Sequence, residues 1–286
     1  MIVLSLFDGI SCGQIALQRA NIPIEKYYSS EIDEQAIKVT QKHFPKTIQL
    51  GDVRNYEQWE IEQPDIIIGG SPCQDLSSCG KKAGLQGERS KLFYDFVGCL
   101  KKYAPKYFLL ENNASMADKY KQEISSILGV EPIMINSNLV SAQNRKRLYW
   151  TNIPGVELPK DKGILLKDIV VPTEEKQQFE CSETIRIKNP TTRAYRYAYA
   201  KMRTLDQKAN CLGTVQHISN ATATNIKYSD DEVYIPTPLE CERLQTLPDN
   251  YTDILCNTRR YKAIGNGWTV DVIAHIFSYL EKGILI

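Results

Sequence analysis

The sequence predicts an α/β fold, with a doubly wound and mostly parallel sheet in a large domain and a small, mainly irregular or β second domain. Short apolar runs recur through the first half of the chain, and segments of helical period separate them. After Pro154 this alternation degrades into short pieces rich in Thr, Asn and Tyr. A chain of 286 residues, 42% of them hydrophobic, is long enough for one large and one smaller domain.

Apolar runs bounded by turn residues define the predicted elements in order. We expect strands at residues 2–7, 27–32, 47–53, 65–70 and 107–110, and two more at 132–140 and 147–153. We expect helices at residues 12–19, 34–43, 91–103 and 119–128. A helix between successive strands makes neighbouring strands parallel and covers both faces of the sheet.

Two further helices are expected near the end of the chain, at residues 238–247 and 269–281. The second is amphipathic, since Val270, Ile273 and Phe277 share one face. That face should pack on the large sheet, which makes the large domain discontinuous. We therefore expect it to comprise residues 1–155 and 258–286, with residues 156–257 forming the second domain and its flanking helix.

Composition favours a cytoplasmic protein. The eight cysteines include no C-x-x-C pair, and the three histidines are too dispersed to form a metal site. The N-terminus lacks a basic region before its apolar residues, and no apolar run approaches the length of a membrane span. We expect no metal and no membrane association.

Charge is unevenly placed in this chain of net charge +1. Residues 181–228 contain eight Lys or Arg and two acids, and tyrosines are interleaved with the arginines. Such a stretch suits contacts to phosphates and stacking on bases. The alternative is a solvated basic loop.

Polar residues follow the first three predicted strands, where doubly wound sheets bind ligands. A turn with Gly9 leads into a helix after the first strand, Glu31 follows the second, and Asp52 follows the third. Glu31 is placed to accept hydrogen bonds from a ribose, and Asp52 from the amino group of an adenine. The glycines lack the G-x-G-x-x-G spacing of a dinucleotide site, so an adenosine-containing ligand of another kind is favoured over a nucleotide-dependent oxidoreductase. Plain turns are the alternative for each feature alone.

The fourth and fifth strands deliver residues suited to covalent catalysis. Cys73, within Ser-Pro-Cys-Gln, follows the fourth strand and can act as a nucleophile. Glu111 follows the apolar fifth strand, where a carboxylate can hold or donate a proton. In an extended segment, Gln143, Arg145 and Arg147 share one face and suit an anionic or carbonyl-rich ligand. Each of these also has a structural alternative: a buried thiol, an exposed acid, or a solvated basic edge.

Taken together, these motifs resemble those of the DNA (cytosine-5) methyltransferases, and they are closest to the de novo branch and to related phage and bacterial enzymes. The resemblance covers nearly the whole chain apart from the basic stretch. It is carried by Leu6-Phe7-Asp8-Gly9, Ser71-Pro72-Cys73-Gln74, Glu111-Asn112-Asn113, Gln143-x-Arg145-x-Arg147, Glu242-Arg243-Leu244-Gln245 and Gly265-Asn266-Gly267. The chain departs from the usual pattern at Ser11, Cys12, Asn113 and Gly267-Trp268, which puts details of cofactor contact in doubt.

The resemblance implies methylation of C5 of cytosine in double-stranded DNA, on the fold of class I S-adenosylmethionine-dependent methyltransferases. Cys73 would attack C6 of a flipped base, and Glu111 would bind and protonate N3. Arg145 and Arg147 would bind the base carbonyl or brace Glu111. The resemblance places S-adenosylmethionine, the cofactor, against Phe7, Asp8, Gly9, Glu31, Ile32, Asp52, Val53, Ser71, Leu92, Asn266 and Trp268.

The expected partner is double-stranded DNA, bound by a monomer, with a homo-oligomer left open. The expected DNA contacts are Gln74, Ser77, Lys81, Lys82 and Arg89 in the loop after Cys73, and Arg193, Arg196 and Arg203 in the second domain. Two other functions remain open: methylation of cytosine in transfer RNA, and DNA binding by a catalytically silent homologue. The recognition sequence, and the choice between restriction–modification, phage and regulatory settings, are also open.

Overall fold

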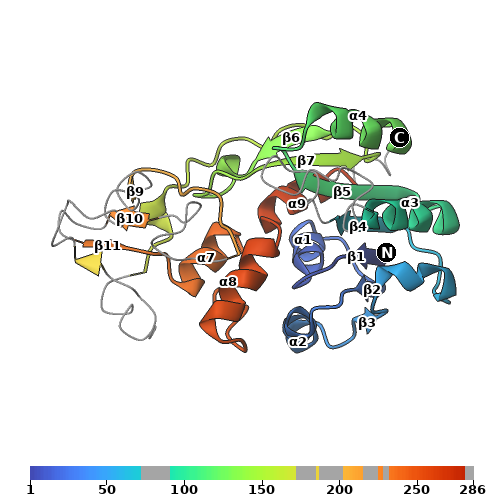
Figure 1. Ribbon diagram of the computed structural model, residues 1–286, viewed down its shortest axis with the longest axis horizontal. Coiled ribbons are helices and arrows are strands. Elements are labelled where there is room, and N and C mark those ends of the chain that lie inside the picture. Colours follow the sequence, from blue (N-terminus) through green and yellow to red (C-terminus); the bar gives the residue numbers. More distant parts are fainter. Residues whose placement is uncertain (72–90, 172–184, 187–201, 215–224, 228–231, 281–286) are drawn as a thin grey trace. The chain divides into compact units, whose positions relative to one another are not determined.

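The computed structural model describes residues 1–71, 91–171, 185–186, 202–214, 225–227 and 232–280 (Figure 1). The chain divides into two compact units. The first comprises Met1–Ile135, Lys146–Leu158 and Ile273–Ile286, and the second comprises Asn136–Arg145 and Pro159–Val272.

A seven-stranded sheet forms the centre of the first unit. Its strands are β1 (Ile2–Leu6), β2 (Lys26–Ser30), β3 (Ile48–Gln49), β4 (Ile66–Gly70), β5 (Tyr107–Asn113), β6 (Ile133–Asn136) and β7 (Lys146–Thr151). They lie in the order β3-β2-β1-β4-β5-β7-β6. The strands from β1 to β5 pair in parallel, whereas β7 runs antiparallel to β5. The predicted α/β fold with a mostly parallel sheet is confirmed.

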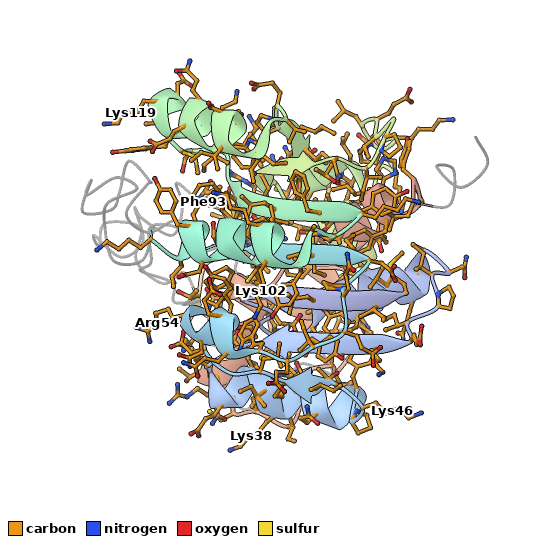
Figure 2. The ribbon with its side chains drawn as sticks, turned by 90° about the vertical axis from the view of Figure 1, so that its right-hand side faces the viewer. Lys38, Lys46, Arg54, Phe93, Lys102 and Lys119 are labelled. Carbon is orange, nitrogen blue, oxygen red and sulfur yellow. The ribbon has the colours of Figure 1, made fainter. Side chains whose placement is uncertain are left out.

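Helices connect these strands. They are α1 (Cys12–Arg19), α2 (Glu34–His43), the 3-10 helix η1 (Val53–Gln58), α3 (Leu92–Tyr103) and α4 (Asp118–Leu128). Figure 2 shows α3 running along the sheet, while the charged ends of side chains such as Lys38 and Lys119 point outward.

The main apolar core of this unit lies between the sheet and α3, η1 and α4. Leu4 and Leu6 of β1 pack in one cluster with Phe93 and Phe96 of α3, and all four side chains are buried. Because side chains alternate along a strand, Ser5 between the two leucines faces the other side of the sheet. This second face carries the polar cluster described below.

Two predicted strands are shorter than expected, because local side-chain bonds end them early. After β3, Gly51 turns the chain with a positive φ of 76°, and the side chain of Asp52 accepts from the Arg54 amide at the start of η1. The strand predicted at residues 132–140 ends at Asn136, whose side chain accepts from the Asn138 amide and begins a 3-10 turn.

The described part of the second unit contains a small sheet, the helices α7 (Pro238–Leu244) and α8 (Asn257–Asn266), and the start of α9 (Val270–Phe277). The sheet joins β8 (Ile185–Arg186), β9 (Met202–Thr204), β10 (Asn225–Lys227) and β11 (Glu232–Tyr234) in the order β8-β11-β10-β9. The helix α7 begins at a capping box between Thr237 and Glu240. The helix α8 was not predicted from the sequence. The last described helix, α9, begins in the second unit, and its residues from Ile273 on belong to the first. Among the described residues, no helix is both long and apolar enough to cross a membrane.

Candidate active site

The register of the parallel sheet brings the carboxyl ends of four strands side by side. Leu6, the last residue of β1, pairs with Ser30 of β2 and with Gly69 of β4. Next along the sheet, Gly70 of β4 pairs with Glu111 of β5. The residues that follow β1, β2 and β4, together with Glu111 itself, therefore lie along one edge, as the sequence predicted.

The turn after β1 is held by Glu31, which follows β2. Phe7 and Gly9 both have positive φ, 57° and 59°. One carboxylate oxygen of Glu31 accepts from the Gly9 amide at 2.8 Å, and the other accepts from the amides of Ile32 and Asp33, each at 2.7 Å. These bonds fix the turn against the end of β2. The Ile32 side chain beside them is 69% exposed.

The carboxylate of Asp8, in the same turn, is occupied by hydroxyl donors. One oxygen accepts from Ser5 at 2.6 Å and from Tyr27 at 2.7 Å. The other accepts from Ser29 at 3.0 Å and from Ser11. Burial raises the pKa of the Asp8 carboxyl, and the hydroxyl donors oppose that rise. Sequence reasoning missed this cluster; serines at Ser5 and Ser29, inside apolar strands, were the available signal.

Asp52, predicted to face an adenine, forms an ion pair with Arg54. Its carboxylate accepts from the Arg54 amide at 3.0 Å and from Nε at 2.9 Å, and this arginine lowers the pKa of Asp52. Val53 is buried, whereas Phe7 and Leu92 are partly buried against the core. The first unit thus places these cofactor candidates near the ends of β1, β2 and β3 and at the start of α3.

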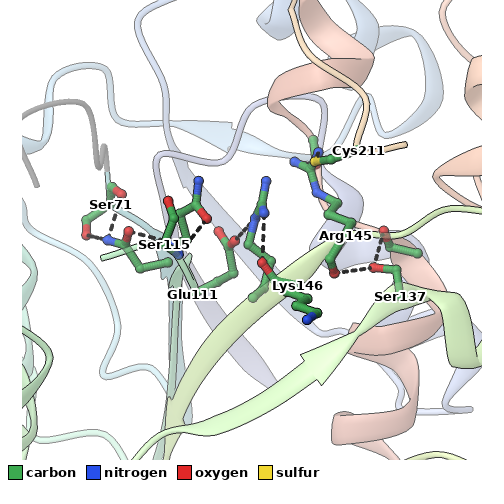
Figure 3. A network of polar contacts seen from close by, with 12 residues as sticks. Ser71, Glu111, Ser115, Ser137, Arg145, Lys146 and Cys211 are labelled. Atoms are coloured by element: carbon green, nitrogen blue, oxygen red, sulfur yellow. Dashed lines mark hydrogen bonds and ion pairs between the residues drawn. The ribbon is translucent and has the colours of Figure 1, made fainter. Parts of the chain in front are cut away.

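Glu111 and Asn112, at the end of β5, make two separate contacts (Figure 3). Glu111 Oε1 pairs with Arg147 Nε at 2.9 Å, and each side chain is only 13% exposed. Asn112 Nδ2 donates to the carbonyl and the hydroxyl of Ser71, at 3.3 and 3.2 Å. Asn112 therefore fixes the backbone two residues before Cys73, which itself lies outside the described residues. Asn112 belongs to the Glu111-Asn112-Asn113 motif, but nothing in the sequence indicated this role.

Arg145 makes different contacts from Arg147. Its guanidinium donates to the carbonyls of Leu212, Gly265 and Gly267 at 3.0–3.1 Å, and Nη1 also lies 3.5 Å from Cys211 Sγ (Figure 3). The residue is 5% exposed. Arg145 therefore joins three chain segments of the second unit.

Gln143 and Gln245 extend this buried network. Gln143 donates to the Leu244 carbonyl at 3.0 Å and accepts from the Leu212 amide at 2.8 Å. Gln245 donates to the Gly267 carbonyl at 3.0 Å. Both glutamines are fully buried. The carbonyl-rich partner expected for this motif is, for Gln143 and Arg145, the protein's own backbone.

Several predicted site residues lie outside the described part of the chain. They are Cys73, Gln74, Ser77, Lys81, Lys82, Arg89, Arg193 and Arg196. Arg203, in β9, donates to Asn210 Oδ1 at 2.6 Å. Asn266 is the exposed last residue of α8, and Trp268 is half-buried. Among the described residues, no cluster of His, Cys, Asp or Glu could hold a metal ion.

Solved structures share this fold. The Dnmt2 methyltransferase of S. pombe superimposes with a TM-score of 0.78 at 17% identity, over 100% of both chains. The Entamoeba histolytica methyltransferase EhMeth gives a TM-score of 0.73 at 16% identity, over 99% of this chain and 98% of that one. The predicted methyltransferase fold is confirmed.

Curated relatives match parts or nearly all of the chain. The type II methyltransferase M.HpaII of Haemophilus parainfluenzae is 29% identical over 94% of this chain and 86% of its own length. M1.ScrFI of Lactococcus lactis is 28% identical over 95% of this chain and 75% of its length. For the orphan methyltransferase M.Rho11sI of Bacillus phage rho11s, the match covers only 35% of that protein. The family model described as C-5 cytosine-specific DNA methylase matches residues 1–282, so the chain belongs to this family.

Proposed function

We propose that this chain transfers a methyl group from S-adenosylmethionine to C5 of cytosine in double-stranded DNA. Family membership supports the reaction type. The observation that carries the proposal is the pair of contacts at the end of β5: Glu111 is held by Arg147, and Asn112 fixes the segment that leads to Cys73. A proton donor and a nucleophile on neighbouring strand ends are what addition to a cytosine ring requires.

The residues around the first three strand ends fit an adenosine-containing cofactor. Glu31 already accepts three backbone amides and is placed at the end of β2, where a carboxylate can also accept from ribose hydroxyls. Ile32 offers an exposed apolar surface beside it, suited to the face of an adenine. When bound, S-adenosylmethionine supplies a methyl group on a cationic sulfur. We assign its remaining contacts to Phe7, Gly9, Asp52, Val53, Ser71, Leu92, Asn266 and Trp268.

The protein residues then supply the nucleophile and the proton. The Cys73 thiolate adds to C6 of the cytosine while Glu111 donates a proton to N3, which makes C5 nucleophilic. Arg147 holds the Glu111 side chain in place. After C5 has taken the methyl group, water accepts the C5 proton, the thiolate leaves C6 and the N3 proton returns to Glu111, which restores the aromatic ring and the free enzyme. The target base must leave the DNA stack for this chemistry.

We also propose DNA contacts for residues of two segments of the chain. Gln74, Ser77, Lys81, Lys82 and Arg89 belong to the segment after the nucleophile. Arg193, Arg196 and Arg203 belong to the proposed recognition domain, residues 156–257, where they would contact phosphates or guanines. We further propose that the protein works as a monomer on DNA in the cytoplasm, within a restriction–modification or phage setting.

Transfer of tritiated methyl groups tests the substrate. Purified protein is incubated with labelled S-adenosylmethionine and either duplex DNA or transfer RNA. The proposal predicts incorporation into duplex DNA, and bisulfite sequencing of that DNA would then locate the methylated sites. Incorporation into transfer RNA alone would replace the proposed substrate, and DNA binding without methyl transfer would identify a silent homologue.

A matched pair of cysteine variants tests the nucleophile. Cys73→Ser should abolish methyl transfer, because a serine hydroxyl is far less nucleophilic than a thiolate at neutral pH. Cys79→Ser makes the same chemical change six residues further along and should remain active. Full activity in Cys73→Ser would refute the assignment.

A further inference from the structure

The partly buried carboxylate of Asp8 has only neutral hydrogen-bond donors. Both oxygens are saturated by the hydroxyls of Ser5, Ser11, Tyr27 and Ser29, and no ion pair to Asp8 occurs among the described residues. The hydroxyls are themselves held in place. Ser11 Oγ, for example, also takes part in bonds with Gln14 and Thr40, at 3.3 and 3.1 Å.

A carboxylate that is partly removed from water without a charged partner is unfavourable to folding. Here, burial raises the pKa of Asp8, and the four hydroxyl donors oppose that rise by stabilising the carboxylate. An asparagine would fit the same space, and serine and tyrosine hydroxyls can accept hydrogen bonds as well as donate them. The hydrogen bonds of the cluster therefore do not require a negative charge at position 8. A role for that charge is then expected outside the cluster.

The residue next to Asp8 indicates what its charge could act on. Asp8 directly precedes Gly9, whose amide is fixed by Glu31, the acid proposed to face the ribose. The carboxylate thus sits inside the turn that the cofactor would approach, yet its oxygens are already used by the four hydroxyls.

We infer that Asp8 is a fixed negative charge behind the cofactor turn, which acts through space to favour a cationic sulfonium ligand over its neutral thioether product. The inference rests on the proposed function. Methyl transfer removes one positive charge from the cofactor, so a nearby anion weakens product binding relative to substrate binding. In a low-dielectric surrounding a unit charge acts over several ångströms without direct contact.

Ligands that differ in charge test this selectivity. The dissociation constants of S-adenosylmethionine, sinefungin and S-adenosylhomocysteine are measured by calorimetry for the wild type and for Asp8→Asn. Sinefungin carries an ammonium group in place of the sulfonium, whereas S-adenosylhomocysteine is neutral at sulfur. We expect Asp8→Asn to lose about three- to tenfold in affinity for both cationic ligands and less than twofold for the thioether.

Three outcomes separate the possibilities. Equal loss for all three ligands would show that Asp8 only shapes the turn and would overturn the inference alone. If the wild-type protein bound none of the three ligands, both the proposed function and the inference would be refuted. Tyr27→Phe is the second variant, because it removes a neutral donor and keeps the charge. It must keep the wild-type ratio of affinities for the cationic and neutral ligands, and a ratio shifted toward the thioether would overturn the inference, whether or not Asp8→Asn folds.

Discussion

Arg145 and Arg147 stand two residues apart in one motif, and the structure predicts that their loss will have different effects. Arg145 donates to three backbone carbonyls and is 5% exposed. Arg147 pairs with Glu111. We predict that Arg145→Lys mainly reduces stability, whereas Arg147→Lys mainly reduces catalysis.

The contacts set the magnitude for Arg145. A lysine ammonium cannot reproduce the planar fork that reaches the carbonyls of Leu212, Gly265 and Gly267 together. The Gly267 carbonyl keeps the donor from Gln245, and a lysine can still satisfy one of the other two. One buried carbonyl is then left without a donor, so Arg145→Lys should lower the free energy of unfolding by about 1–3 kcal/mol.

Arg147 is expected to affect stability much less. It makes one ion pair of 2.9 Å with Glu111, at a site where both side chains keep 13% of their exposure. A lysine keeps a positive charge beside Glu111, so Arg147→Lys leaves no uncompensated charge and should lower the free energy of unfolding less than Arg145→Lys does. Misplacing the proton donor, however, should lower methyl transfer about 100-fold.

Urea unfolding and methyl-transfer kinetics, measured on both variants at a temperature where each is folded, distinguish the two effects. Lys146→Ala is the matched control, because Lys146 is exposed and lies between the two arginines. Equal destabilisation by both variants would refute the reasoning. So would an Arg145→Lys protein of wild-type stability.

Three other perturbations follow from described contacts. Arg54 lowers the pKa of Asp52 below its ordinary 3.8, so the pair stabilises the folded state above pH 3.8 and loses this effect as the pH falls through the folded-state pKa. In urea unfolding, the loss of unfolding free energy caused by Arg54→Ala should therefore shrink below pH 3.8. A loss that stays constant with pH would contradict this. Burial raises the pKa of Cys99 to about 12, so iodoacetamide at pH 8 should label the exposed Cys256 but not Cys99. Peptide mapping would detect the labelled cysteines, and equal labelling of the two would contradict the burial of Cys99. Asn112→Ala should lower methyl transfer about tenfold or more, since Asn112 holds Ser71 and so the chain that leads to Cys73, whereas Asn113→Ala should not; an equal loss in both variants would argue against positioning.

The sheet and its functional edge could be predicted because both depend on local patterns. Buried parallel strands are nearly continuous apolar runs, and a polar residue that ends such a run marks the edge where ligands bind. Glu31 and Glu111 were identified in this way, and the structure places them at the ends of β2 and β5. The helix α8 was not predicted because its sequence is polar, with few apolar positions to give a helical period.

The roles of Arg145 and Asp8 could not be read from the sequence, because their partners carry no side-chain signature or lie far away. Arg145 binds carbonyls at positions 212, 265 and 267, and any residue type offers a carbonyl. A shared face in an extended segment grouped Gln143, Arg145 and Arg147 as donors to one ligand, whereas the structure gives Arg147 a different partner from the other two. Only Arg147 lies within β7, where pairing with β5 brings it beside Glu111. The roles of the residues in this motif thus depend on where the strand begins. The strand β7 begins at Lys146, so Arg145 lies before it and binds backbone carbonyls, whereas Arg147 lies within it and contacts Glu111, the proposed proton donor.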